Sequence, residues 1–420
     1  MKELEYTRLG ERCYYETLAN GLTVFVLPKA GFSKSFAFFA THYGGQDERF
    51  RTGERWKQTP GGVAHFLEHK MFDMPGENAL LTLSARGASP NAFTSNDITG
   101  YYFSCTDQVY ENLRTLLHFV TTPYFTEESV AKEQGIIGQE IRMMEDNPDW
   151  RIYNNLIQSL YANHTIRNSV AGTVESIAKI TPEVLESCHR TFYHPSNMVL
   201  CVAGNVEPRK VLQMAAAVVP VGEKQTIWRD HGAPEKPESA CQEISLEMEV
   251  SAPSFLLGFK AEPNGTLRSK LVGELAAELL AGDSSPLYAK LYQEGLIDKT
   301  FGVEFDSNGE TAHFIMGGES SEPVKVAERI MSEGVRIAWN GVDDALFRRL
   351  RKAIYGAKVR ALNSFEHTCI QIAKGYFEGY QYLDFADLYE QITRQEVEEL
   401  LRESITGVRS ALSIVRPKGV

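Results

Sequence analysis

The sequence lacks any apolar run long enough to cross a bilayer, because its apolar stretches are short and interrupted by polar residues. The first residues, Met1 to Tyr6, carry charges of both signs with no apolar stretch behind them, which argues against a signal peptide. The 6 cysteines show no Cys-x-x-Cys spacing, and we interpret them as buried thiols in a reducing compartment. We therefore expect a cytoplasmic protein without a membrane span.

Positive charge is also scarce. The chain has 43 Lys and Arg against 55 Asp and Glu, a formal net charge of −12. A protein that binds a phosphate backbone needs a surplus of cations on the binding face, so this balance argues against a nucleic-acid-binding protein. The one basic cluster, within residues 348–360, lies on a predicted helix, and we interpret it as a solvated helix face.

The chain has enough apolar residues for two cores. It has 420 residues, of which 43 % are hydrophobic, and this length is large for a single core. We predict an N-terminal α+β domain over 1–222, a linker over 223–242 that is rich in Gly, Pro, Ser and charge, and a C-terminal α+β domain over 243–420. The similar order of predicted strands and helices in the two halves indicates a weak internal duplication.

The first half contains the best-defined predicted elements. They are strands over 22–27, 35–41, 92–104 and 198–203, and helices over 63–72, 110–120 and 126–145. In the longest helix Thr126 can act as the N-cap, and Asn147-Pro148 is expected to end the helix, because proline cannot continue its hydrogen-bond ladder.

A metal-binding pattern lies on the predicted helix over 63–72. His65 and His69 are spaced i and i+4, so both imidazoles project from one face, with Glu68 beside them. This is the reversed form of the His-Glu-x-x-His zinc helix. A catalytic zinc needs a third protein ligand, for which we choose Glu140; Glu133, two helical turns earlier, lies on the same face. The alternative is that the two histidines are packing residues and Glu68 is a surface acid.

Four sequence blocks, in order along the chain, favour the metal site. The segment Gly61 to Phe72 resembles the zinc helix of the pitrilysin and mitochondrial-processing-peptidase family, the inverzincins. Three further blocks resemble the substrate-binding edge strand, the third-ligand helix and the end of the first domain in that family. These blocks are Ser89 to Ser95 with Thr99 and Tyr101, Glu133 to Glu140 with Ile141 and Met143, and Ala171 to Ile177 with Tyr193 to Met198.

The resemblance implies a fold and a set of roles. The fold would be α+β, with two homologous α/β-sandwich domains, each a mixed and mainly antiparallel sheet backed by helices. The two domains would form a half-shell, and two half-shells would enclose a chamber. His65, His69 and Glu140 would bind Zn²⁺, Glu68 would be the general base, and Glu133 would be a catalytic-site carboxylate beside the ligands.

The same resemblance implies how a peptide would bind. Asn91 and Ala92 fall at the start of the strand that would pair with the substrate backbone. Pairing of this kind reads backbone more than side chains, so we expect a metalloendopeptidase that acts on short or unfolded peptides. The physiological substrate, for example a peptide precursor or the products of general turnover, stays open.

One departure from the family pattern concerns the second half. Family members that work alone carry an Arg and a Tyr, seven residues apart, where this sequence has Tyr292 and, approximately, Asp298. The chain therefore resembles the zinc-bearing chain of the half-size, two-chain bacterial branch. We expect a heterodimer with a homologous chain that carries the Arg–Tyr pair, although a homodimer is possible. The rival interpretation is a catalytically inactive scaffold subunit of a family complex.

Overall fold

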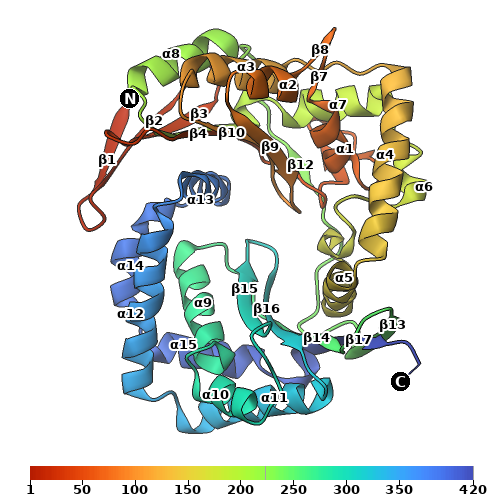
Figure 1. Cartoon of the computed structure of the whole chain (residues 1–420), viewed down its shortest axis with the longest axis vertical. Helices are drawn as coiled ribbons and strands as arrows, with labels where there is room; N and C mark the ends of the chain where they lie inside the picture. The colour runs from red at the N-terminus through yellow and green to blue at the C-terminus, as the bar shows by residue number, and fades with distance from the viewer. Residues whose placement is uncertain (223, 420) are drawn as a thin grey trace. The chain divides into compact units, whose positions relative to one another are not determined.

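The computed structural model of the protein describes residues 1–222 and 224–419 (Figure 1). The chain forms two compact units, each assembled from separate stretches of sequence. The first unit contains the described residues of Met1–Arg142, Asn168–Gly232 and Ala361–Phe377. The second contains those of Met143–Arg167, Ala233–Arg360 and Glu378–Val420. The predicted linker over 223–242 begins at a residue outside the described part, and the predicted domain limits stay predictions.

The first unit is built on a seven-stranded mixed sheet in the order β1-β2-β3-β11-β4-β10-β9. β3 and β11 run parallel, and the other neighbouring strands are antiparallel. β9 is therefore an edge strand. The strands are β1 (Lys2–Tyr6), β2 (Glu11–Thr17), β3 (Thr23–Pro28), β4 (Ser35–Thr41), β9 (Ser89–Thr94), β10 (Thr99–Cys105) and β11 (Met198–Gly204).

The strand predicted over 92–104 is wrong as a single element. It is the hairpin of β9 and β10, in which Ala92 lies opposite Tyr101. The turn closes through a 2.8 Å hydrogen bond from Ser95 N to Ile98 O, and the Ser95 hydroxyl bonds Asp97 at 2.9 Å. Ser and Asp side chains stabilise turns by local hydrogen bonding. This turn signal was overlooked because the residues on both sides of it favour β-strands.

The second unit repeats the sheet topology of the first. Its five strands follow the order β13-β17-β14-β16-β15, with β13 and β17 parallel and the other pairs antiparallel. In chain order, β13 to β17 correspond to β3, β4, β9, β10 and β11 of the first sheet. These five strands of the first sheet have the same spatial order, β3-β11-β4-β10-β9. The internal duplication is therefore confirmed. The strands are β13 (Glu243–Met248), β14 (Ser254–Lys260), β15 (Gly302–Ser307), β16 (Ala312–Glu319) and β17 (Ser410–Pro417).

Helices cover both faces of the first sheet. Tyr101 on one face contacts Phe119 of α3, with ring centroids 5.8 Å apart. On the opposite face, Tyr376 of α13 packs against Phe25 at 5.8 Å and accepts a 2.9 Å hydrogen bond from Thr23 Oγ1. The helices that lie wholly or mainly in this unit are α1 (Val63–Lys70), α2 (Ala79–Ala85), α3 (Val109–Thr121), α4 (Glu127–Glu145), α6 (Val174–Ile177), α7 (Pro182–Phe192), α8 (Pro208–Val218) and α13 (Phe365–Glu378).

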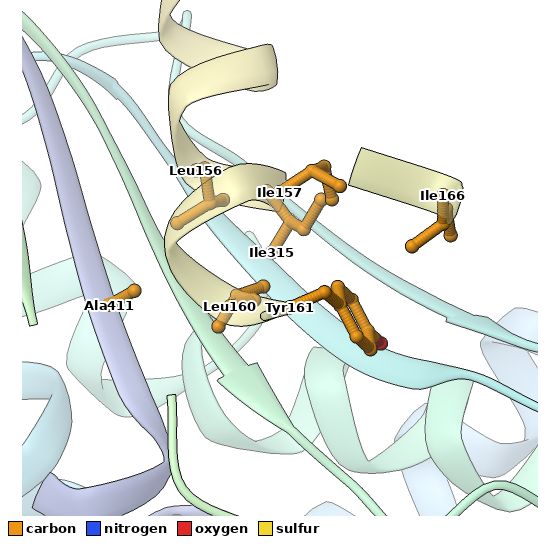
Figure 2. Packing of buried hydrophobic residues seen from close by; sticks show 7 residues of the cluster. All are labelled: Leu156, Ile157, Leu160, Tyr161, Ile166, Ile315 and Ala411. Carbon is orange, nitrogen blue, oxygen red and sulfur yellow. The ribbon is translucent and has the colours of Figure 1, made fainter. Parts of the chain in front are cut away.

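The second unit is backed by its own helices, and one of them comes from the N-terminal half of the sequence. In Figure 2, Leu156 and Leu160 of α5 (Pro148–Leu160) pack with Ile315 of β16 and Ala411 of β17. The other helices of this unit are α9 (Leu267–Ala281), α10 (Pro286–Gln293), α11 (Pro323–Asn340), α12 (Asp344–Ala361), α14 (Phe385–Gln391) and α15 (Arg394–Ser404). Two mixed sheets backed by helices confirm the predicted α+β fold class.

Both ends of α4 lie where the sequence predicts them. Thr126 caps the helix, because its hydroxyl accepts a 3.1 Å hydrogen bond from Ser129 N. At the other end, Pro148 does more than stop α4. Asn147 accepts hydrogen bonds from the N–H groups of Asp149 and Trp150, and Pro148 becomes the first residue of α5.

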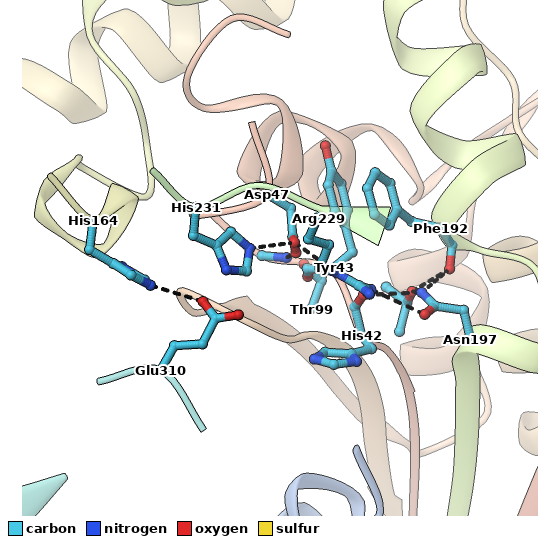
Figure 3. Close-up of polar contacts among 12 residues, drawn as sticks. His42, Tyr43, Asp47, Thr99, His164, Phe192, Asn197, Arg229, His231 and Glu310 are labelled. Carbon is cyan, nitrogen blue, oxygen red and sulfur yellow. Dashed lines mark hydrogen bonds and ion pairs between the residues drawn. The ribbon is translucent and has the colours of Figure 1, made fainter. Parts of the chain in front are cut away.

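A buried polar network fixes residues 228–231 on the first unit. Figure 3 shows Asp47 between Arg229 and His231, with distances of 2.9 Å to Arg229 Nε and 3.1 Å to His231 Nε2. Burial opposes ionisation of Asp47, but the hydrogen bond from His231 and the charge of Arg229 keep its pKa below the usual value. The guanidinium of Arg51 lies over the Trp228 ring, 5.2 Å from the ring centroid, which adds a cation–π contact.

No helix in residues 1–222 and 224–419 is long and apolar enough to cross a membrane. Five of the cysteines are buried, as expected, whereas Cys241 is exposed.

We predict that Gly62→Ala destabilises the first unit. Gly62 precedes α1 with φ 93°, a left-handed conformation, and an added Cβ would lie 2.5 Å from the Ala171 carbonyl oxygen. The conformation alone costs about 1–2 kcal/mol for a residue with a side chain, and the clash adds to it. Urea unfolding should show a loss of at least about 2 kcal/mol. Gly53→Ala is the control, because its Cβ would meet no atom within 4 Å; equal effects of the two substitutions would contradict the prediction.

Candidate metal centre

Helix α1 keeps one face for packing and one for polar groups. Its buried residues are Val63, Ala64, Phe66, Leu67 and Lys70. The residues between them at i, i+3 and i+4 spacing, His65, Glu68 and His69, are only partly buried and share the opposite face. The segment is helical because no proline or β-branched run interrupts it after Val63, and its backbone starts with Phe66 N bonding Gly62 O at 2.9 Å.

Helix α4 places two carboxylates on one face. Glu133 and Glu140 are seven residues apart, about two turns, so their side chains lie one above the other. The helix is anchored along the neighbouring face by buried Val130, Ile137 and Ile141. Burial of that apolar face fixes the rotation of α4, and hence where the two carboxylates point.

The structure brings His65, His69 and Glu140 together, with one ligand atom from each residue lying within 4.8 Å of the other two. The Nε2 atom of His65 lies 3.7 Å from Glu140 Oε1, and Nε2 of His69 lies 3.5 Å from Glu140 Oε2. The other nitrogen of His69, Nδ1, bonds Glu133 Oε1 at 3.0 Å. The two helices therefore converge on one point through Nε2 of both histidines.

The protonation of the two histidines differs. Burial, followed by the neighbouring His69, lowers the pKa of His65 to about 3, so its imidazole is neutral and offers a lone pair. Burial also lowers the pKa of His69, but the hydrogen bond to Glu133 and the charges of Glu68 and Glu140 outweigh it, and the net pKa is raised. A carboxylate that accepts the Nδ1 proton leaves Nε2 as the metal-facing nitrogen.

These residues fit a zinc ion. Ligand atoms at ~2.1 Å from a tetrahedral zinc lie about 3.4 Å apart, and the two histidine-to-Glu140 distances of 3.5 and 3.7 Å are close to that value. Two imidazoles and one carboxylate are also the donor set of one class of catalytic zinc site, which leaves a position open for water. The exposed fraction of the Glu140 side chain is 39 %, so the point of convergence is accessible to solvent.

Glu68 lies beside the metal ligands on α1, but its hydrogen-bond partner comes from β9. Its Oε2 accepts a 2.9 Å hydrogen bond from the Thr94 hydroxyl. Burial raises the pKa of Glu68, while the Thr94 hydrogen bond opposes that shift. A carboxyl group whose pKa is moved toward neutrality exchanges protons more readily near pH 7.

Asn91 and Ala92 lie on the edge strand β9. The Ala92 N–H donates a 2.9 Å hydrogen bond to Asn91 Oδ1, the side chain of its own neighbour. Because β10 pairs with β9 on the other side, this edge of the sheet is open to an added strand within the described residues. The helix α1 packs against the same strand.

In the second unit, Tyr292 and Asp298 are not arranged as an oxyanion-binding pair. Tyr292, in α10, stacks on Tyr288 with ring centroids 6.1 Å apart and is 46 % exposed. Asp298 accepts hydrogen bonds from Thr300 N and Oγ1, which lower its pKa. An ionised carboxylate cannot donate a hydrogen bond to an oxyanion.

The residue that sequence reasoning missed is Thr94. It lies within the block from Ser89 to Ser95, where only Asn91 and Ala92 are expected to have a role. Period-2 alternation along a strand places Thr94 on the same side as Ala92, which is the signal that could have indicated it.

Comparison with known proteins agrees with this geometry. Residues 52–174 match the model of the insulinase family (peptidase family M16), and residues 179–354 match that of the peptidase M16 inactive domain. A Bacillus subtilis protein described as uncharacterized zinc protease YmfH is 39 % identical over 428 residues, covering 100 % of both chains.

Solved structures extend the comparison. A crystal structure described as an M16-like peptidase from Alicyclobacillus acidocaldarius has a TM-score of 0.93 and 33 % identity, over 97 % of this chain and 99 % of that one. A protease from Helicobacter pylori shares the fold, with a TM-score of 0.84 and 16 % identity over 97 % of this chain and 100 % of that one. The family resemblance predicted from the four sequence blocks is therefore confirmed, and the chain belongs to the M16 peptidase family, which includes insulinase and pitrilysin.

Proposed function

We propose that this chain is a zinc-dependent metalloendopeptidase that hydrolyses short or unfolded peptides. The observation that carries the proposal is the convergence of His65, His69 and Glu140 within 4.8 Å, with Glu68 on the same helix face. The name of the Bacillus subtilis relative, a zinc protease, supports the same activity.

The chain's own residues have distinct tasks in this reaction. A zinc ion held by His65, His69 and Glu140 supplies a Lewis acid that makes water a better nucleophile near neutral pH. Glu68 accepts a proton from the attacking water and returns it to the leaving amine. Glu133 keeps the His69 imidazole in one orientation through its 3.0 Å hydrogen bond.

The substrate would lie as an extended strand along β9. Its backbone would pair with the open edge at Asn91 and Ala92, where the Ala92 N–H is bonded only to a neighbouring side chain that can move aside. A folded protein offers few unpaired strands, whereas a short or unfolded peptide offers its whole backbone. Backbone pairing therefore favours peptides as substrates.

We propose further that a homologous chain with an Arg–Tyr pair completes the active site, with this protein as the zinc-bearing chain. Support comes from Tyr292 and Asp298, which occupy the positions where a self-sufficient chain would carry that pair. Asp298 is tied to Thr300 and has a lowered pKa, so it offers no proton to an oxyanion. A second copy of this chain would lack the pair as well.

Glu68→Gln tests the role of the base. The substitution keeps the size and the hydrogen-bond acceptor for Thr94, so zinc content should be unchanged, while hydrolysis of a fluorogenic peptide should fall about 10²–10⁴-fold. Metal analysis measures the zinc content. The rate of the variant is compared with that of the wild-type chain under the same conditions, either alone or with the partner chain, whichever gives the wild type its higher rate. If the wild-type chain contains no zinc and does not hydrolyse the peptide, the result would instead support the inactive scaffold subunit.

Glu140→Gln and Glu133→Gln should separate a ligand from the group that supports it. Loss of the Glu140 carboxylate removes a metal ligand, so zinc should no longer copurify. Loss of the Glu133 carboxylate leaves three ligands but gives the His69 ring a neutral amide in place of a charged acceptor, so zinc affinity should fall about 10–100-fold without being abolished. Competition with a fluorescent zinc chelator measures both affinities. Equal affinities in the two variants would contradict the assigned roles.

Mixing experiments test the partner. The purified chain alone should hydrolyse peptides slowly, and adding a homologous chain from the same organism that carries the Arg–Tyr pair should raise the rate about 10²–10³-fold, the effect of one oxyanion donor. A Tyr-to-Phe variant of that partner is the matched control and should give little increase. Robust turnover by the chain alone, or a rate unchanged on mixing, would refute the partner.

A further inference from the structure

The two carboxylate oxygens of Glu68 have different surroundings. Oε2 accepts the 2.9 Å hydrogen bond from Thr94 Oγ1, and no other described residue donates a hydrogen bond to either oxygen. A carboxylate with one oxygen held and one free has a restricted torsion angle, so its free oxygen points in a defined direction. A proton-transferring group depends on such a direction, because the proton moves only over hydrogen-bond distance.

The group that holds Glu68 comes from the edge strand and not from the zinc helix. Thr94 is the last residue of β9, opposite Thr99 of β10. Thr99 Oγ1 lies 3.4 Å from Thr94 Oγ1 and donates a 2.9 Å hydrogen bond to the carbonyl oxygen of Tyr43, which follows β4. The end of β9 is therefore fastened to the interior of the sheet.

The turn after Thr94 is also fixed. Gly45 N and Gln46 N donate 2.9 Å hydrogen bonds to the carbonyl oxygens of Ser95 and Asn96. One end of β9 is thus held by backbone bonds, while the stretch around Ala92 presents its free edge. Alternation along the strand places Thr94 and Ala92 on the same side.

We propose that Thr94 is a positioning residue that aims the free oxygen of Glu68 and links the general base to the strand on which the peptide binds. A peptide that pairs with β9 would bind the same strand that carries the Thr94 hydroxyl, so one strand would hold both the substrate and the general base. This inference rests on the proposed peptidase function and assigns to it a residue that is neither a metal ligand nor the general base.

The test compares Thr94→Val, which keeps the branched shape and removes the hydroxyl, with Thr94→Ser, which keeps the hydroxyl. For Thr94→Val we expect kcat to fall about 10–100-fold with KM within about twofold, since substrate still binds but the base is misaligned. Thr94→Ser should restore kcat to within about threefold of wild type. All variants should bind zinc equally, because no metal ligand changes.

A matched control exists elsewhere in the same unit. Thr82 Oγ1 of α2 donates a 3.0 Å hydrogen bond to Glu77 Oε2 of β8 (Glu77–Asn78), a Thr–Glu pair that involves none of the candidate site residues, so Thr82→Val should leave kcat unchanged. Thermal unfolding of each variant identifies a loss of folding. If Thr94→Val keeps the wild-type kcat, or if Thr94→Ser loses as much as Thr94→Val, Thr94 has a packing role and the inference is wrong.

Failure of this inference is distinguishable from failure of the proposed function. If Glu68→Gln abolishes hydrolysis while Thr94→Val is as active as wild type, the peptidase stands and the role of Thr94 falls. If Glu68→Gln keeps the wild-type rate, Glu68 is not the base, and the alignment of Glu68 by Thr94 is overturned with it.

Discussion

The hydrogen bond between His69 Nδ1 and Glu133 Oε1, 3.0 Å long, is the interaction on which the metal centre depends. It joins α1 to α4, two helices that are far apart in the sequence. With its Nδ1 engaged, the imidazole has only Nε2 left to offer, and that nitrogen faces Glu140 at 3.5 Å. One contact therefore sets both the tautomer of a ligand and the pairing of the helices that supply the ligand set.

The sheet performs a second task that the helices cannot. An ion held between α1 and α4 would activate water, but the peptide carbonyl must also be delivered to it. In this unit β9 is an edge strand of the sheet, and α1 packs against β9 and its neighbour β10. The Thr94–Glu68 hydrogen bond connects this strand to the proposed general base. In the proposed peptidase, binding by strand addition and proton transfer by a helix residue would therefore share one structural element.

Sequence reasoning identified what depends on local spacing and missed what depends on tertiary contact. The i, i+4 histidines and the seven-residue separation of Glu133 and Glu140 are periodic features, so the order of residues alone reveals them. The hairpin between β9 and β10 was missed because Ser95 and Asp97 form a short turn within a β-rich stretch. The placement of α5 on β14 and β17, and of α13 on the first sheet, was also out of reach. Both helices leave the unit to which their sequence neighbours belong, and only packing partners distant in sequence decide that.

The duplicated topology shows why a candidate metal site lies on α1 and not on α9, its counterpart in the second unit. Between β4 and β9 the chain forms α1 and α2, and between the equivalent strands β14 and β15 it forms α9 and α10. In α1 the polar face is left free for His65, Glu68 and His69. In α9, by contrast, ten of fifteen residues are buried, and Gly273 lies so close to Phe305 of β15 that an added Cβ would fall 2.0 Å from its ring. The second copy uses both faces of its helix for packing, which leaves no surface there for a metal site. The same sheet order can therefore support either a catalytic centre or a packed core, and the difference lies in which helix face is kept polar.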